Sequence, residues 1–175
     1  GITTAEIQEI LIRSASDLID LDNPNYQFVA ARLLLFSLRK QLWGRMHEHG
    51  NLTDHVRDGI ERGVYDPEIL QKYSPEEFDM IDHDRDYLFT YAGLRQVVDK
   101  YLVQDRSTGS VYETPQFMYI LIAATIFSDY PQETRLDYVK KYYDAISKHK
   151  VNIPTPVMAG VRTPLRQYAS CVLVD

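Results

Sequence analysis

Apolar residues recur every three or four positions through most of the first 150 residues, which is the spacing of amphipathic helices. Thr3 and Glu6 have the spacing of a capping box and predict the start of a first helix that ends near Asp20. A second, longer helix is predicted from Asn23-Pro24 to about Trp43. The apolar positions of these two helices are Ile7, Ile10, Leu11, Ala15, Leu18, Ile19, Tyr26, Val29, Leu33, Leu34, Phe36 and Leu38.

Shorter helices are predicted in the next part of the chain. Thr53 has the character of an N-cap for a short helix that Gly63 ends. Asp66-Pro67 and the capping-box pattern at 74–77 start two more. A further helix is predicted over 86–98.

The most apolar helix follows a predicted β-hairpin. Residues 101–104 and 110–113 flank a turn at Thr108-Gly109 and predict the two strands. Thr114-Pro115 then starts an apolar helix, which we expect at the centre of the core. An amphipathic helix follows Tyr130-Pro131 and closes at the basic residues near 148–150.

The pattern changes at residue 151. Pro154 and Pro156 predict extended backbone there, and residues 167–175 have the pattern of a buried strand that contains Cys171. A strand in that position needs a partner for its backbone groups. We therefore expect the chain to be part of a larger active site, and Gly1 in place of Met to mark a trimmed start.

Composition narrows the class of protein. The 175 residues are 45% hydrophobic and 25% charged, as in an ordinary globular domain, and no apolar run is long enough to span a membrane. A net charge of −6 argues against a general nucleic-acid surface. One cysteine cannot form an intrachain disulfide or a Cys-rich zinc site, and no signal peptide precedes Gly1, so we expect a reducing cytoplasm.

The sequence resembles a known family in six places. Residues 150–173 (KVNIPTPVMAGVRTPLRQYASCVL) look like the entry into the catalytic barrel of class I ribonucleotide reductase large subunits. Five segments match the same family in the expected order: 26–33 (YQFVAARL), 81–86 (IDHDRD), 100–103 (KYLV), 112–117 (YETPQF) and 133–136 (ETRL). The match covers essentially the whole chain but only the front part of the family's subunit.

The resemblance implies a mainly α fold with three parts. Residues 1–45 would be the closing helices of a partial ATP-cone, and 46–150 the helical N-terminal domain with its small β-hairpin. Residues 151–175 would enter the catalytic α/β barrel with its first strand.

The resemblance also implies an activity: the reduction of ribonucleoside diphosphates to deoxyribonucleotides. Cys171 matches one of two reducing cysteines, a role that suits a thiol because its disulfide is reversible. Thr155 and Ser170 match positions that contact the substrate nucleotide, where a hydroxyl can hydrogen bond without bulk. The implied partners are the remainder of the large subunit, a small subunit whose metal site generates the radical, and thioredoxin or glutaredoxin as reductant. From the residues alone, Cys171 could equally be inert packing, Thr155 a turn residue and Ser170 a solvent-facing hydroxyl.

An effector nucleotide is a further implication. Thr4 and Lys40 fall where the ATP-cone binds the phosphates of ATP or dATP, and a helix-start hydroxyl with an ammonium group suits an anion. Their alternative roles are an N-cap neighbour and a charge near a helix C-terminus.

Two other classes of function are open. The chain could be a non-catalytic helical module for docking or regulation, in which case Cys171 would be dispensable. It could also be a small metal-dependent hydrolase built around His83 and Asp84, although no second histidine cluster has the spacing of a metal site and we expect no bound metal.

Overall fold

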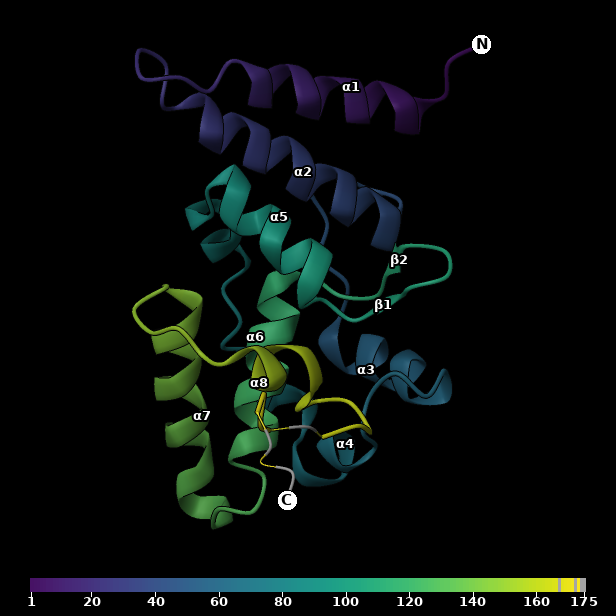
Figure 1. The fold of residues 1–175 in the computed structure, drawn as a ribbon. Helices are drawn as coiled ribbons and strands as arrows, with labels where there is room; N and C mark the ends of the chain where they lie inside the picture. The colour runs from purple at the N-terminus through teal and green to yellow at the C-terminus, as the bar shows by residue number, and fades with distance from the viewer. Residues whose placement is uncertain (167, 172, 174–175) are drawn as a thin grey trace.

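In the computed structural model, which describes residues 1–166, 168–171 and 173, the chain is mainly helical with one small hairpin (Figure 1). This confirms the predicted mainly α class. The helices are α1 (Thr4–Asp17), α2 (Tyr26–Trp43), α3 (Leu52–Glu61), α4 (Glu68–Lys72), α5 (Tyr91–Lys100), α6 (Pro115–Ile126), α7 (Gln132–Ser147) and α8 (Thr155–Gly160). Two 3₁₀ helices are η1 (Pro75–Phe78) and η2 (His83–Leu88), and the strands are β1 (Gln104–Asp105) and β2 (Ser110–Val111).

Helix α6 is the centre of the core, as its apolar sequence predicted. Every residue from Pro115 to Ala124 is buried, and α7 packs along it. Pro115 occupies the first turn of the helix, where its missing N–H costs no hydrogen bond.

Helices α1 and α2 form an antiparallel pair at one edge of the molecule, and α2 also packs against α5 (Figure 1). The predicted capping box is present, with the Thr3 side chain accepting from the Glu6 N–H at 3.2 Å. Ala15 is the one buried residue of α1, whereas Ile7, Ile10 and Leu11 are exposed in the described structure. The apolar stripe of α1 is therefore mostly uncovered here.

Several helix boundaries differ from the prediction because other caps act. Helix α3 starts at Leu52, one residue before Thr53, because the Asn51 side chain accepts from the Asp54 N–H at 3.1 Å. The helix predicted over 86–98 is two elements, because Thr90 caps a new helix and accepts from Gly93 N–H at 3.3 Å.

The largest difference lies after residue 151. Thr155 begins the short helix α8, where extended backbone was predicted. Only Pro154 is extended, and it serves as the N-cap, while Pro156 sits in the first helical turn where proline is tolerated. The expectation of sheet beyond residue 151 is wrong for 155–166, which form α8 and a turn.

The predicted strand at 167–175 lies partly outside the described residues. Those that the structure describes, 168–171 and 173, form no strand, and Cys171 is exposed. A strand exists only with a partner to pair its backbone, and the hairpin β1–β2 is the one sheet in the described part of the chain.

Candidate functional site

The residues matched to substrate and redox roles lie at the start of α8, where Thr155 is, and near the C-terminal end of the chain, where Ser170 and Cys171 are. Ser170 and Cys171 are both exposed, with the Ser170 hydroxyl 3.8 Å from the Cys171 sulfur. Thr155, at the start of α8, is exposed and lies 3.4 Å from the phenol oxygen of Tyr101. Thr155, Ser170 and Cys171 belong to one continuous stretch of sequence, 155–171. No hydrogen bond among the described residues joins Thr155 to Ser170 or Cys171.

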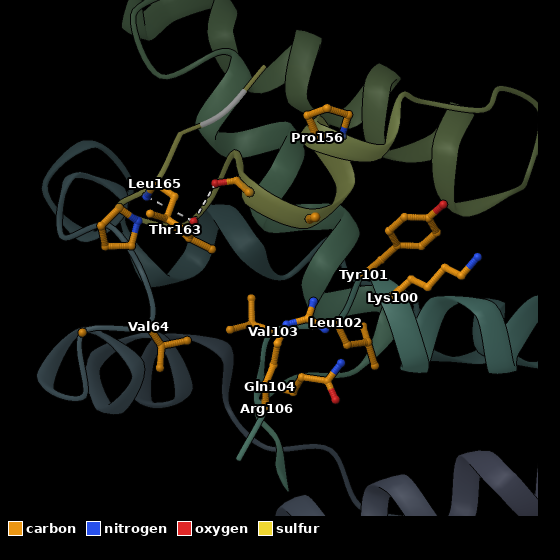
Figure 2. A pocket seen from close by; sticks show the side chains of 14 residues that line it. Val64, Lys100, Tyr101, Leu102, Val103, Gln104, Arg106, Pro156, Thr163 and Leu165 are labelled. Carbon is orange, nitrogen blue, oxygen red and sulfur yellow. Dashed lines mark hydrogen bonds between the residues drawn. The ribbon is translucent and has the colours of Figure 1, made fainter. Parts of the chain in front are cut away.

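A cavity of about 470 Å³ lies beside this segment (Figure 2). Its walls are residues 100–104 and Arg106, the end of α8 with the following turn, and the loop after α3. Tyr101 and Lys100 stand on one side and Thr163 and Leu165 on the other (Figure 2). Thr155 does not line the cavity, although its neighbour Pro156 does.

The turn after α8 is held by its own hydrogen bonds. The Thr163 hydroxyl donates to the Gly160 carbonyl at 2.8 Å and accepts from the Leu165 N–H at 3.3 Å (Figure 2). Val161, Arg162 and Thr163 are buried, so the segment is anchored well before it reaches Cys171.

A buried ion pair lies under this anchor. The Arg162 Nε is 3.1 and 3.0 Å from the two carboxylate oxygens of Glu113, and its Nη2 also contacts Glu113. Both side chains are 0% exposed. Sequence reasoning placed both residues in family motifs but assigned neither a role. The available signal was a single charge amid apolar neighbours, in Val111-Tyr-Glu-Thr-Pro and in Gly160-Val-Arg-Thr-Pro.

Around that ion pair, two aromatic side chains are kept neutral. Burial, reinforced by the Glu113 charge, raises the pKa of the Tyr65 phenol well above its ordinary 10. Its hydroxyl donates to Glu113 at 2.9 Å. Burial lowers the pKa of His55, whose Nε2 is 3.0 Å from the Tyr65 oxygen. Since the single Tyr65 proton goes to Glu113, His55 must donate to Tyr65 through a protonated Nε2.

A second buried ion pair lies under α2. Arg39 is 3.4 Å from Asp86, and Gln116 donates to Asp86 at 2.8 Å. Tyr143 in turn donates to Gln116 at 2.7 Å. Burial raises the pKa of Asp86 from its ordinary 3.8 to about 6, against the opposing effects of Gln116 and Arg39.

His83 and Asp84 are the two residues around which a metal-dependent hydrolase site was considered. The His83 ring stacks on His49 with centroids 3.9 Å apart, and Asp84 is exposed. Burial, with the His49 and Arg39 charges, lowers the pKa of His83 to about 3. No group of three His, Cys, Asp or Glu side chains among the described residues could hold a metal ion. This geometry gives the hydrolase hypothesis no support.

Thr4 and Lys40 lie on adjacent helices. Thr4 is the first residue of α1 and is exposed, while Lys40 is half-buried near the end of α2. Since α1 and α2 are antiparallel, these two helix ends lie on the same side of the pair (Figure 1). A cavity of about 650 Å³ between α1, α2 and α5 is lined by neither residue.

Comparison with known proteins agrees with this architecture. The sequence pattern of the family described as "Ribonucleotide reductase, all-alpha domain" matches residues 87–166, from η2 to the turn after α8. The chain belongs to the ribonucleotide reductase large-subunit family and corresponds to the amino-terminal region of those subunits.

Three relatives illustrate the range of similarity. Over all of its length the chain is 53% identical to ribonucleoside-diphosphate reductase 1 subunit alpha of Escherichia coli (strain K12), and 45% identical to the subunit alpha of Enterobacteria phage T4. Over 98% of its length it is 33% identical to the subunit alpha of Helicobacter pylori. The chain spans 23%, 24% and 21% of these relatives, about a quarter of each. In the described residues, no helix has both the length and the apolar character that a membrane crossing requires.

Proposed function

We propose that this chain is the amino-terminal part of a ribonucleoside-diphosphate reductase large subunit and acts in the reduction of ribonucleoside diphosphates to deoxyribonucleoside diphosphates. The observation that carries the proposal is the 53% identity over the whole chain to a subunit of that name, and the resemblance of residues 150–173 to the family's barrel entry supports a redox role for Cys171. The complete activity needs the rest of the subunit, because only one cysteine is present here.

Cys171 would supply half of the reducing equivalents. In the overall step, two thiols become one disulfide and lose two electrons and two protons, while the C–OH bond of the ribose becomes C–H and the oxygen leaves as water. The substrate radical that permits this chemistry would depend on a separate small subunit with a metal site. Thioredoxin or glutaredoxin would reset the disulfide by thiol exchange, for which an exposed sulfur is accessible.

The other sites belong to the same proposal. Thr155 and Ser170 would contact the substrate nucleotide through their hydroxyls. Residues 1–45 would be part of an ATP-cone in which Thr4 and Lys40 bind phosphate, with 46–150 as the helical domain and 151–175 as the entry to the barrel. A cytoplasmic location fits a thiol that must be kept reducible.

The test of the redox role is Cys171→Ser in the complete large subunit, assayed with its small subunit and thioredoxin. We expect steady-state reduction to fall by roughly 100-fold or more, because the disulfide cycle is broken. The circular dichroism spectrum and Tm should not change, since Cys171 is exposed and the helical core does not contact it.

Ser170→Ala is the matched control, because it changes one neighbouring exposed side chain without removing the thiol. We expect it to raise KM more than it lowers kcat. Wild-type turnover by C171S would refute the redox role and favour the non-catalytic interaction module.

A further inference from the structure

The Glu113–Arg162 pair joins parts of the chain that are distant in sequence. Arg162 follows α8, and Glu113 lies two residues before α6. The backbone N–H of Val103 donates to Glu113 at 2.8 Å, which brings in the hairpin, and Tyr65 brings in the loop after α3. The pair therefore ties the segment that bears the candidate site to the helical domain.

The Arg162 side chain reaches two further backbone carbonyls. Its Nη2 donates to the Tyr101 carbonyl at 2.9 Å, and its Nη1 donates to the Met158 carbonyl within α8. Its own carbonyl accepts from the Asp66 N–H at 3.1 Å. Since the same Tyr101 lies 3.4 Å from the Thr155 hydroxyl, the contacts of Arg162 continue to a candidate substrate residue.

A second, outer contact holds the same segment. The Arg166 guanidinium lies 2.7 Å from Asp66 and also pairs with Glu68 at the start of α4. These groups are partly exposed, so their contribution is modest. The inner pair is fully buried, and Arg162 contacts Glu113 and two backbone carbonyls.

We propose that Glu113 and Arg162 are positioning residues for the reductase site, which set the direction and register of the segment carrying Thr155, Ser170 and Cys171. This inference rests on the proposed function. Neither side chain is exposed to a substrate, so neither is a catalytic residue.

The physical argument is that a buried ion pair is a poor device for stability alone. Removing two charges from water offsets most of their mutual attraction, and apolar residues of similar volume often stabilise as well. What the pair does supply is a single geometry, because the planar guanidinium accepts only one orientation against a carboxylate and two carbonyls. Arg162 lies nine residues before Cys171, so a small rotation here moves the thiol.

The experiment uses the complete large subunit with Arg162→Lys and Glu113→Gln. Lysine keeps the charge but loses the planar fork, and glutamine keeps the shape but loses the charge. The measurement, made with the small subunit present and without an external reductant, is the rate of deoxynucleotide formation in a single turnover per folded subunit, together with the Kd of the substrate. We expect the single-turnover rate to fall at least about tenfold, since a displacement near 1 Å can cost up to roughly 100-fold. Substrate Kd should change by less.

The matched control is Arg39→Lys, in an equally buried pair that lies under α2. This variant should lower Tm without changing the single-turnover rate of the protein that remains folded. Cys171→Ser in the same assay reports on the proposed function itself. If C171S is as active as the wild type, the reductase assignment fails, whatever R162K does.

The positioning role is overturned if R162K and E113Q are folded and turn over within twofold of the wild type. It is also overturned if both fail to fold at the assay temperature, because the pair would then be a folding element. A rate loss in R162K equal to that in R39K would likewise remove the distinction on which the proposal depends.

Discussion

The two buried ion pairs of this domain differ in how completely they are satisfied. Glu113 receives Arg162, the Tyr65 hydroxyl and the Val103 N–H. Arg39, in contrast, meets Asp86 in one contact of 3.4 Å, and its Nε is buried without a hydrogen-bond partner. Desolvation is offset only where the contacts are many and short. The Glu113–Arg162 pair is held in one geometry by its contacts, whereas the desolvation cost of the Arg39–Asp86 pair is only partly offset.

The surroundings of the two pairs explain this difference. Arg39 contacts the Tyr87 ring, with its guanidinium carbon 5.5 Å from the ring centroid, and donates to the His83 carbonyl at 3.3 Å. These are weak, long contacts, and they link α2 and η2, which also lie directly against each other. Arg162 instead links, through Glu113, a turn, a hairpin and a loop.

The largest expected effect on stability comes from replacing one of the two buried arginines. Arg162→Met should lower the free energy of unfolding by about 3–5 kcal/mol, because it leaves the Glu113 charge buried and unpaired. Arg39→Met should cost about 1–2 kcal/mol at pH 7, since Asp86, with a pKa of about 6, takes up a proton at small cost and keeps the bond from Gln116. Urea denaturation of both variants followed by circular dichroism measures the difference. Equal losses would show that the two pairs are equivalent.

The next effect is a pH dependence specific to the Arg39–Asp86 pair. The folded state holds the Asp86 proton up to about pH 6, whereas the unfolded chain releases it near 3.8. Stability from this group is therefore present at pH 4 and is lost as the pH rises through 6. The difference in unfolding free energy between the wild type and Asp86→Asn should fall by about 2–2.5 kcal/mol from pH 4 to pH 7.

Asp79→Asn, at an exposed position, is the control for this pH series. The difference between this variant and the wild type over the same range is the background for the D86N series. A D86N difference that does not exceed this background would mean that Asp86 ionises as freely in the folded protein as in the unfolded chain.

A smaller effect on stability is expected from Gly59→Ala, which tests whether the Tyr65 ring is held in place. Gly59 lies in α3, and a Cβ there would clash with the Tyr65 ring. Gly59→Ala should therefore destabilise by about 1–3 kcal/mol through overpacking, despite a helix preference of up to ~1 kcal/mol for alanine.

Thermal unfolding checks this prediction against Gly93→Ala in α5, where the nearest contact of a Cβ is 3.3 Å, from the Thr90 hydroxyl. That control should be close to neutral. A stabilised G59A would mean that Tyr65 has room to move and does not hold Glu113.

Some of the fold could be predicted because its causes are local. The capping boxes at Thr3 and Ser74 and the proline in the first turn of α6 lie within three or four residues of the groups they satisfy. The break before α5 was missed because Thr90 reads equally well as a helix interior residue until its side chain is seen to accept from Gly93.

The candidate site was only partly predictable. Cys171, Thr155 and Ser170 are candidates only through their motif context, since an isolated cysteine or hydroxyl carries no signal of its own. The extended backbone expected at Thr155 was wrong because proline suits a helical first turn as well as an extended segment, and the two cannot be separated by composition.

The amino-acid sequence by itself determined the number and kind of most helices, the hairpin and the family, because capping, periodicity and motif identity act over short stretches of chain. The pairing of Glu113 with Arg162, 49 residues apart, was decided by tertiary structure alone. A charged side chain next to apolar neighbours can point to solvent or into the core, and only the packing of α3, the hairpin and α8 around this position closes off water and leaves each charge the other as its partner.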